Sequence, residues 1–237
     1  MMKRFLAAVQ FLTVLPVPGS TAPLGEAAVF FPVIGATLGS VSGVFFFGTT
    51  RSLAALLAVA FLLIATGCLH EDGLADAADA IRAGRTREKM ITILKDSRIG
   101  TYGALALIVS VLIRWQALAS CRVNPVYGLA GALALSRSAL VVLAGSTPSV
   151  GEGLGREFAA TISRATVLAV IGQACVFAFL TGWVYGAAML LCSGAIVLLA
   201  RSWFMRRLGG VNGDCLGATC QAVEMTNLVI LSCRLSA

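Results

Sequence analysis

The sequence predicts an all-α fold: a polytopic bundle of about seven transmembrane helices, with the N-terminus in the cytoplasm. Only 12% of its 237 residues are charged, whereas a soluble domain carries about 25%. Hydrophobic residues make up 58% of the chain, and the mean hydropathy is +0.91. Apolar runs with short polar connections follow one another along the chain, at residues 27–47, 53–69, 104–119, 125–144, 165–180, 184–200 and 216–231.

The elements can be taken in chain order. Residues 1–17 join a basic start to an apolar stretch that prolines end, which favours an amphipathic or shallowly inserted helix over a cleaved signal peptide. In the first span, Pro32 is expected to kink the helix, because proline removes a backbone hydrogen bond. A turn at 83–85 and a short helix over 87–95 are predicted between the second and third spans. No linker separates a second domain, so residues 1–237 form one integral-membrane domain.

Basic residues gather on one side of the predicted membrane. With the N-terminus inside, segments 67–100, 145–164 and 201–213 all face the cytoplasm and carry most of the Lys and Arg residues, as the positive-inside rule requires. The excess of Lys and Arg behind the net charge of +7 is therefore interpreted as the mark of cytoplasmic loops. Nucleic acid is excluded as a partner, because no basic run is interleaved with aromatic residues. The seven cysteines are scattered without a CxxC pair, so neither a disulfide framework nor a zinc site is predicted.

The densest polar pattern is residues 70–79, which hold four of the eleven acidic side chains and directly follow the second span. The pattern predicts a helix through Ile81, with Asp72, Asp76 and Asp79 at positions i, i+4 and i+7 on one face. Three like charges at this spacing repel one another unless a cation lies between them, and oxygen ligands suit Mg²⁺. A Mg²⁺ site is therefore predicted, with a solvated acidic helix end as the alternative.

A second polar string, KDSRIGTYG at residues 95–103, leads into the third span. Lys95 and Arg98 can pair with phosphate oxygens. Ser97 and the backbone amide of Gly100 can donate hydrogen bonds at a helix N-terminus, which favours anions. The string predicts a phosphate-binding segment, and the alternative is a cytoplasmic anchor with a glycine turn.

Glycines surround an acidic residue before the last span, in GGVNGD at residues 209–214. Gly210 is expected to let the backbone close on a ligand, and Asp214 is a further candidate metal ligand. Glu224 lies inside the last apolar run, where a carboxylate normally faces the bundle interior or a partner. Arg137, deep in the fourth span, either neutralises Glu224 or holds a phosphate, and the sequence leaves both roles open.

His70 is the only histidine. Two residues before Asp72, it can ligate a metal, orient a carboxylate, or accept a substrate proton near neutral pH. Asp76 is the other candidate catalytic base.

Together these strings resemble the cobalamin synthase family, the adenosylcobinamide-GDP ribazoletransferases. The motif that carries most of the resemblance is GCLHEDGLADAAD. The chain departs from the family at Cys68, within this motif, and at Ala80, directly after it; glycine is frequent at both positions. The matching segments are residues 11–18, 31–35, 67–79, 95–103 and 209–218.

The resemblance implies a Mg²⁺-dependent, multi-pass transferase of the bacterial inner membrane, with its active site on the cytoplasmic face. Its substrates would be adenosylcobinamide-GDP and α-ribazole or α-ribazole 5′-phosphate. Its products would be GMP and adenosylcobalamin or its 5′-phosphate. The implied metal ligands are Asp72, Asp76, Asp79 and Asp214, and the implied phosphate-binding cations are Lys95, Arg98 and Arg137. Whether the chain forms a homo-oligomer is left open.

Other protein classes share parts of the pattern. CDP-alcohol phosphotransferases also place an aspartate-rich motif at a membrane mouth, but two aspartates precede the glycine there and an Ala-Arg pair follows. Aspartate-rich membrane prenyltransferases need a second aspartate-rich helix, for which Asp214 with Glu224 is a poor substitute. A secondary transporter would use Glu224 and Arg137 as coupling charges and would show inverted repeats, and no repeat is evident in this sequence.

Overall fold

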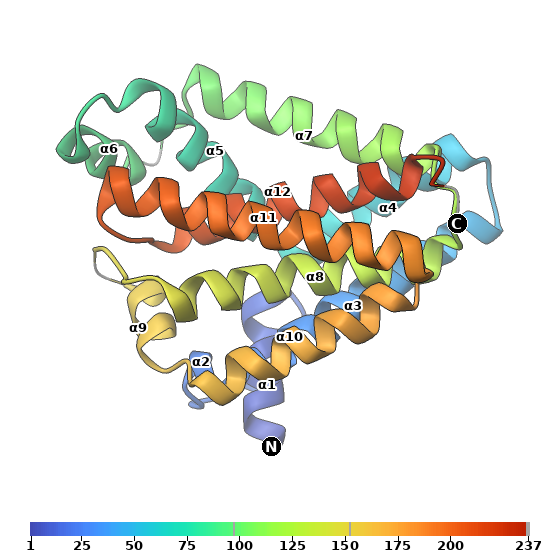
Figure 1. The fold of residues 1–237 in the computed structure, drawn as a ribbon, viewed down its shortest axis with the longest axis horizontal. Coiled ribbons are helices and arrows are strands. Elements are labelled where there is room, and N and C mark those ends of the chain that lie inside the picture. The colour runs from blue at the N-terminus through green and yellow to red at the C-terminus, as the bar shows by residue number, and fades with distance from the viewer. Residues whose placement is uncertain (97, 152, 236–237) are drawn as a thin grey trace.

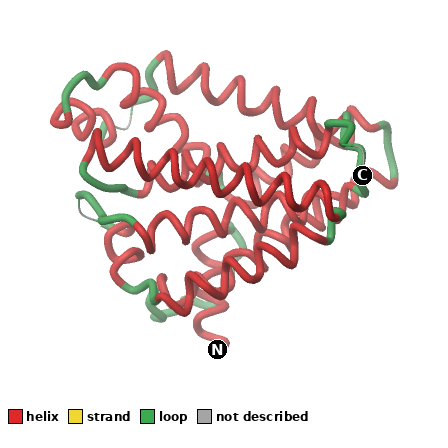
Figure 2. Tube along the Cα trace, in the orientation of Figure 1, coloured by secondary structure: helices red, strands yellow, loops and turns green. Residues whose placement is uncertain are grey.

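The computed structural model describes residues 1–96, 98–151 and 153–235, and in this part of the chain the regular elements are all helices (Figure 1). Figure 2 shows that loops are short and gather at the helix ends. The elements are α1 (Met2–Leu12), α2 (Leu24–Ala27), η1 (Ala28–Phe30), α3 (Phe31–Gly43), η2 (Val44–Phe47), α4 (Arg51–Thr66), α5 (Leu69–Ala83), α6 (Arg87–Leu94), α7 (Thr101–Ala119), α8 (Pro125–Ser146), α9 (Leu154–Ala160), α10 (Arg164–Phe179), α11 (Trp183–Leu208) and α12 (Gly213–Ser232).

Five helical segments of the described chain are long and apolar enough to cross a membrane. They are Leu24–Phe47, α7, α8, α11 and α12. The number rises to seven if each of two bent helix pairs, α4 with α5 and α9 with α10, counts as one span. The apolar runs of the sequence lie in these helices apart from the bend at residues 67–68 and the last residue of the 165–180 run, so the all-α, multi-span prediction is confirmed.

The outer surface of the bundle is apolar, as a lipid-facing surface should be. α7 exposes Leu105, Val109 and Leu112, α10 exposes Leu168, and α11 exposes Leu198. A soluble monomer rarely exposes continuous apolar stripes of this kind. The exposed faces therefore agree with burial in a bilayer.

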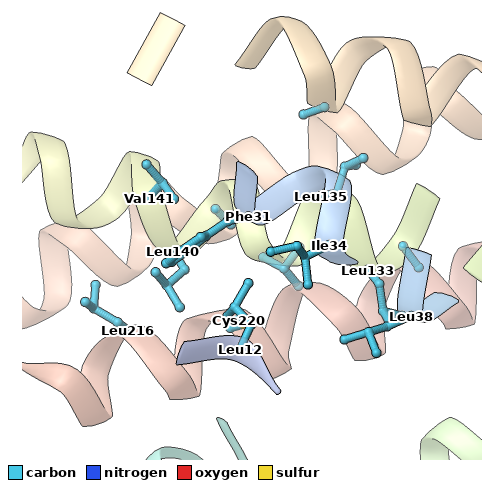
Figure 3. Packing of buried hydrophobic residues seen from close by; sticks show 14 of the residues in the cluster. Leu12, Phe31, Ile34, Leu38, Leu133, Leu135, Leu140, Val141, Leu216 and Cys220 are labelled. Atoms are coloured by element: carbon cyan, nitrogen blue, oxygen red, sulfur yellow. The ribbon is translucent and has the colours of Figure 1, made fainter. Parts of the chain in front are cut away.

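The core of the bundle is built around α8, which α3, α10, α11 and α12 contact. α3 packs closely against it because Gly35 and Gly39 lie at the contact. A Cβ atom on either glycine would collide with the α8 backbone near Leu133 or Leu129. Figure 3 shows side chains from α1, α3, α8 and α12 meeting in one buried cluster, Leu12 and Cys220 among them.

α4 and α5 meet at an angle of 90°. Two successive residues in the left-handed conformation make this bend, Gly67 at φ +60° and Cys68 at φ +56°. Only glycine adopts this conformation without steric cost, and another residue loses about 1–2 kcal/mol there. The bend brings the polar helix α5 to the end of the bundle where α6 and α9 also lie (Figure 1).

The connection between α5 and α6 confirms the predicted order of helix, turn and short helix. Pro32 lies in the first turn of α3, where the α-helix follows the 3-10 turn η1 inside the helical segment Leu24–Phe47. The first turn of an α-helix is the position that proline occupies most readily, and the kink expected there stays a prediction.

The three polar segments expected on one side of the membrane do lie at one end of the bundle. The Val150 N–H donates to the Val211 carbonyl at 2.8 Å, and the Val211 N–H donates to the Pro148 carbonyl at 2.9 Å. Arg207 donates to the Gly84 carbonyl at 3.0 Å. These bonds connect the 145–164, 201–213 and 67–100 segments.

Candidate active site

α5 presents its acidic residues on different sides. Glu71 and Asp79 are buried, with exposures of 6% and 7%, whereas Asp72 is exposed and Asp76 is half-buried. The helix expected over this motif is confirmed, with Asp76 one turn after Asp72. Glu71 points about 100° away from Asp72 around the helix, whereas Asp79 lies on the same stripe as Asp72 and Asp76 and is covered by the start of α7.

Two glycines let α5 and α12 touch. A Cβ atom on Gly73 would lie 3.1 Å from the Asp214 Cα atom, and one on Gly217 would lie 3.3 Å from the Gly73 Cα atom. This close approach brings Asp72 and Asp214 to the wall of one cavity of about 150 Å³. Among the residues that line this cavity are Phe11, His70, Leu140, Leu154, Gly155, Phe158 and Gly213.

A second cavity of about 330 Å³ adjoins the first, and the two share Leu154, Gly155, Gly213 and Asp214 in their walls. It adds two cations, Lys95 from the end of α6 and Arg156 from α9. We call the two cavities together the active-site cleft. The cleft therefore holds carboxylates at one end and cationic side chains at the other, with Asp214 common to both.

Asn212 organises the α12 side of the cleft. Its Oδ1 accepts the Cys215 N–H at 3.0 Å and so caps the helix, while its Nδ2 donates to the Asp214 Oδ2 at 2.7 Å. The cap fixes where a helix of 20 residues begins, and the start of a helix carries a partial positive charge. Asn212 thus holds the Asp214 carboxylate at the mouth of the cleft.

Asp79 makes contacts that the sequence did not predict. Its Oδ2 accepts the Gly100 N–H at 2.7 Å, and its Oδ1 accepts the Tyr102 and Gly103 N–H groups at 3.1 and 3.0 Å. These are the unpaired amides at the start of α7. Asp79 therefore joins α5 to α7 as a cap supplied from another helix, and the prediction that it ligates metal alongside Asp72 and Asp76 finds no support in this geometry.

The residues of the 95–103 string have different environments in the structure. Lys95 lines the cleft. The Arg98 side chain is 87% exposed and pairs with Asp96 at 2.8 Å, and hydrogen bonding to Arg98 lowers the pKa of Asp96 to about 2. The Gly100 amide is occupied by Asp79, which argues against its predicted role as an anion donor. Ser97, the fourth predicted phosphate ligand, lies outside the described residues.

Four buried charges form a network behind the cleft. Arg114 Nη1 lies 2.8 Å from Glu71 Oε1 and 3.4 Å from Glu224 Oε1. Arg137 donates to the other Glu224 oxygen, and Gln221 donates to Glu71 at 3.0 Å. Of the two roles left open for Arg137, neutralising Glu224 is the one the structure displays, and its contact with a phosphate stays a prediction.

Two more predicted residues have clear positions. His70 lines the smaller cavity but is only 2% exposed, and its Nε2 has no hydrogen-bond partner within the described chain. Gly210 is not among the residues that line the cleft, and a Cβ atom on it would collide with the Pro148 carbonyl and the Val150 side chain. Its backbone thus packs closely against this neighbouring segment, and its contact with a ligand stays a prediction.

A sequence model of the family described as Cobalamin-5-phosphate synthase matches residues 4–232 of this chain. The chain belongs to that family. Curated relatives with the name adenosylcobinamide-GDP ribazoletransferase include one from Geotalea daltonii, 34% identical over 98% of this chain and 97% of its own. The relative from Escherichia coli O45:K1 is 35% identical over 98% of both chains, and that from Vibrio cholerae O395 is 34% identical over 96% of this chain and 92% of its own. No solved structure matches.

Membership of the cobalamin-5-phosphate synthase family confirms the resemblance read from the motifs. It gives no support to the alternatives of a CDP-alcohol phosphotransferase, a prenyltransferase or a transporter. The relatives' lengths are nearly those of this chain, so the comparison concerns the whole described bundle.

The donor atoms of the cleft suit Mg²⁺. Asp72 and Asp214 face one cavity, and Asp76 lies within electrostatic reach of both. In the described part of the chain, no three acidic, histidine or cysteine side chains are close enough to enclose an ion by themselves. Mg²⁺ commonly uses only one or two protein carboxylates, with substrate phosphates and water completing its shell. The oxygen-only arrangement fits that mode of binding.

Sequence reasoning missed Arg114, Gln221 and Arg156. The role of Arg114 could have been predicted. An arginine inside an apolar run is costly unless it pairs with an acidic side chain, and the acidic motif offers Glu71 as such a partner. Arg156 followed a glycine pair in a loop with no other distinguishing pattern. Its place in the cleft depends on how α9 folds back, which the sequence does not indicate.

Proposed function

We propose that this chain transfers the adenosylcobinamide-phosphate group of adenosylcobinamide-GDP to α-ribazole or α-ribazole 5′-phosphate. GMP leaves, and adenosylcobalamin or its 5′-phosphate forms. The observation that carries the proposal is the active-site cleft, where Asp72 and Asp214 stand beside Lys95 and Arg156 in a member of this family. A diphosphate needs such a combination of cation-binding carboxylates and positive charge.

In this proposal Asp72 and Asp214 hold Mg²⁺, and Asp76 adds negative charge close to both. Bound there, the ion would neutralise diphosphate charge and favour departure of the nucleotide. Asp79 was also predicted as a ligand, but its oxygens already accept hydrogen bonds from three backbone amides. We therefore assign Asp79 to the support of α7.

The chain's own groups have separate roles in the reaction. Lys95 and Arg156 bind the phosphates of the nucleotide portion, and the α12 N-terminus faces the same space. The ribazole hydroxyl oxygen attacks the phosphorus attached to the cobinamide, and the bond from that phosphorus to the GMP oxygen breaks. His70 or Asp76, both close to Asp72 on α5, accepts the hydroxyl proton. The apolar walls around Phe11 and Phe158 exclude water, which would otherwise compete as nucleophile.

The cleft is proposed to open to the cytoplasm of a bacterial cell, with the protein in the inner membrane. The basic segments at this end of the bundle support that orientation under the positive-inside rule. With seven spans, the C-terminus would lie on the opposite side. A C-terminal reporter enzyme that is active only outside the cytoplasm should be active, and its inactivity would reverse the orientation.

The decisive assay uses the purified chain in lipid vesicles with adenosylcobinamide-GDP, α-ribazole and Mg²⁺, and measures GMP release. Asp72→Asn and Asp214→Asn should each lower the turnover by at least about 100-fold, as expected when charge stabilisation at the reacting group is lost. Chelation of Mg²⁺ should abolish turnover, and added Mg²⁺ should restore it. Cys192→Ala, in α11 away from the cleft, is the matched control. Full activity in both aspartate variants would overturn the assignment.

A further inference from the structure

A third polar cavity, of about 410 Å³, lies where α5, α7 and α11 come together at one end of the bundle. It has no lining residue in common with the active-site cleft. We call it the arginine pocket. Its lining consists of Ile81, Arg82, Gly84, Arg85, Tyr102 and Arg207.

Three guanidinium groups from different parts of the fold converge on the arginine pocket. Arg82 comes from the last turn of α5 and lies over the Tyr102 ring at 5.8 Å. Arg207 comes from the last turn of α11 and is held by the Gly84 carbonyl at 3.0 Å. Arg85 comes from the turn that follows α5. Two of the three guanidinium groups are thus held in place by neighbouring groups.

The positive charge of the arginine pocket has no counterpart in its wall. No carboxylate lines it in the described part of the chain, and none of its arginines takes part in an ion pair between described residues. Like charges gathered in one pocket repel, and an anion relieves the repulsion. The planar arginine fork matches phosphate oxygens, with which it forms paired hydrogen bonds.

The arginine pocket also lies at the end of a lipid-facing stripe. Tyr102, Leu105, Val109 and Leu112 follow one another at i, i+3, i+7 and i+10 along α7, and their exposures are 44%, 53%, 49% and 50%. They therefore share one outer face of the helix. Tyrosine is favoured at the level of lipid headgroups, and Ile81 adds an exposed apolar side chain at the pocket rim.

From this geometry we propose that the arginine pocket binds the phosphate of an anionic phospholipid, with the acyl chains along the outer face of α7. The same arginines could attract a soluble phosphate. The continuous apolar stripe below the pocket favours the lipid, because a soluble phosphate makes no use of it. Basic pockets between membrane helices are known to take lipid headgroups of this kind. The bound lipid would tie together the ends of α5, α7 and α11.

The test measures lipid retention by native mass spectrometry of the full chain in detergent. The protein is titrated with phosphatidylglycerol and, separately, with phosphatidylcholine of the same acyl chains. The wild type should retain phosphatidylglycerol preferentially. Arg85→Gln and Arg207→Gln should each reduce this preference about fivefold, the effect expected of one arginine near an anionic headgroup. Arg164→Gln, an exposed arginine at the start of α10, is the matched control and should change nothing.

Arg207 also supports the α5–α6 turn, so its variant can lose structure for another reason. Arg85 makes no such contact in the described chain, and Arg85→Gln therefore carries the test alone if Arg207→Gln does not fold. An unchanged lipid preference in Arg85→Gln would overturn the proposal. A separate titration with inorganic phosphate distinguishes the source: arginine-dependent phosphate binding with no preference between the two lipids would also overturn the lipid assignment.

Discussion

Replacing Asp79 separates a structural role from a metal-binding one. The Asp79 carboxylate accepts three backbone N–H groups at the start of α7, at 2.7, 3.1 and 3.0 Å. In Asp79→Ala these amides lose their acceptor. Tyr102 lies at the surface, where water can replace the bond, whereas Gly103 is buried and Gly100 is half-buried. We therefore count the loss of hydrogen-bond energy only for the bonds from Gly100 and Gly103.

A hydrogen bond to a charged group contributes about 1.5–3 kcal/mol, and a lost helix cap costs about 0.5–2 kcal/mol. For two bonds these values give about 3–6 kcal/mol and about 1–4 kcal/mol. We expect Asp79→Ala to lower the free energy of unfolding by about 3–4 kcal/mol, where the two ranges overlap. For a chain of this size that corresponds to a fall in Tm of about 5–15 °C. Asp79→Asn keeps one acceptor oxygen for two of the amides but places an NH₂ group beside the third, so its loss should be about half as large.

The assay combines thermal unfolding in lipid with GMP release at increasing Mg²⁺. At a temperature where Asp79→Ala is still folded, the Mg²⁺ concentration for half-maximal activity should equal that of the wild type. Asp72→Asn should show the reverse pattern, with an unchanged Tm and a disturbed Mg²⁺ response. If Asp79→Ala instead keeps its Tm and needs more Mg²⁺, Asp79 is a metal ligand and the reasoning above is wrong.

Three further predictions concern the buried network, the bend and the cleft. Arg114→Met leaves Glu71 without its charged partner and should lower the free energy of unfolding by about 3–5 kcal/mol. Adding Glu71→Gln should recover part of that loss, and equal Tm values for the single and double variants would contradict the pairing. Cys68→Gly should raise stability by about 0.5–1 kcal/mol, since removal of left-handed strain outweighs the added freedom of the unfolded chain, and a lower Tm would show that the thiol side chain matters more. Lys95→Gln should raise the KM for adenosylcobinamide-GDP about tenfold, because a charged hydrogen bond is lost. Arg98 faces solvent, so Arg98→Gln should leave the KM within about twofold of the wild-type value. Similar effects of the two variants would contradict a contact between Lys95 and the substrate.

Local sequence patterns were enough to predict most of the fold. The apolar runs predicted the long helices because backbone groups in a bilayer must bond within their own segment. The acidic motif predicted α5 because its aspartates repeat at the helical period. Hydropathy shows where an apolar run lies but does not show at which residue the α-helix begins, so it did not place Pro32 in the first turn of α3.

Part of the chemistry of the candidate site could also be predicted from local sequence patterns. Asp72, Asp76, Asp214 and Lys95 were singled out because acids and bases are rare in this chain, and rare charges in a membrane protein mark functional positions. Sequence spacing alone could not separate Asp79 from the other aspartates, since all three share one helical stripe. The difference arises from α7, whose amides approach only one end of that stripe.

By itself the sequence determined a helical membrane bundle and the kinds of side chain available for phosphate chemistry, because periodicity and composition act over a few turns of helix. Its motifs, and not its periodicity, carried the resemblance to the family. Only the tertiary structure decided which partner each charge has. Glu71 meets Arg114, 43 positions away, and Gln221, 150 positions away. In the low dielectric of the bundle interior such pairs are chosen by how the helices pack, and packing depends on the close approach of α5 and α12 at Gly73 and Gly217.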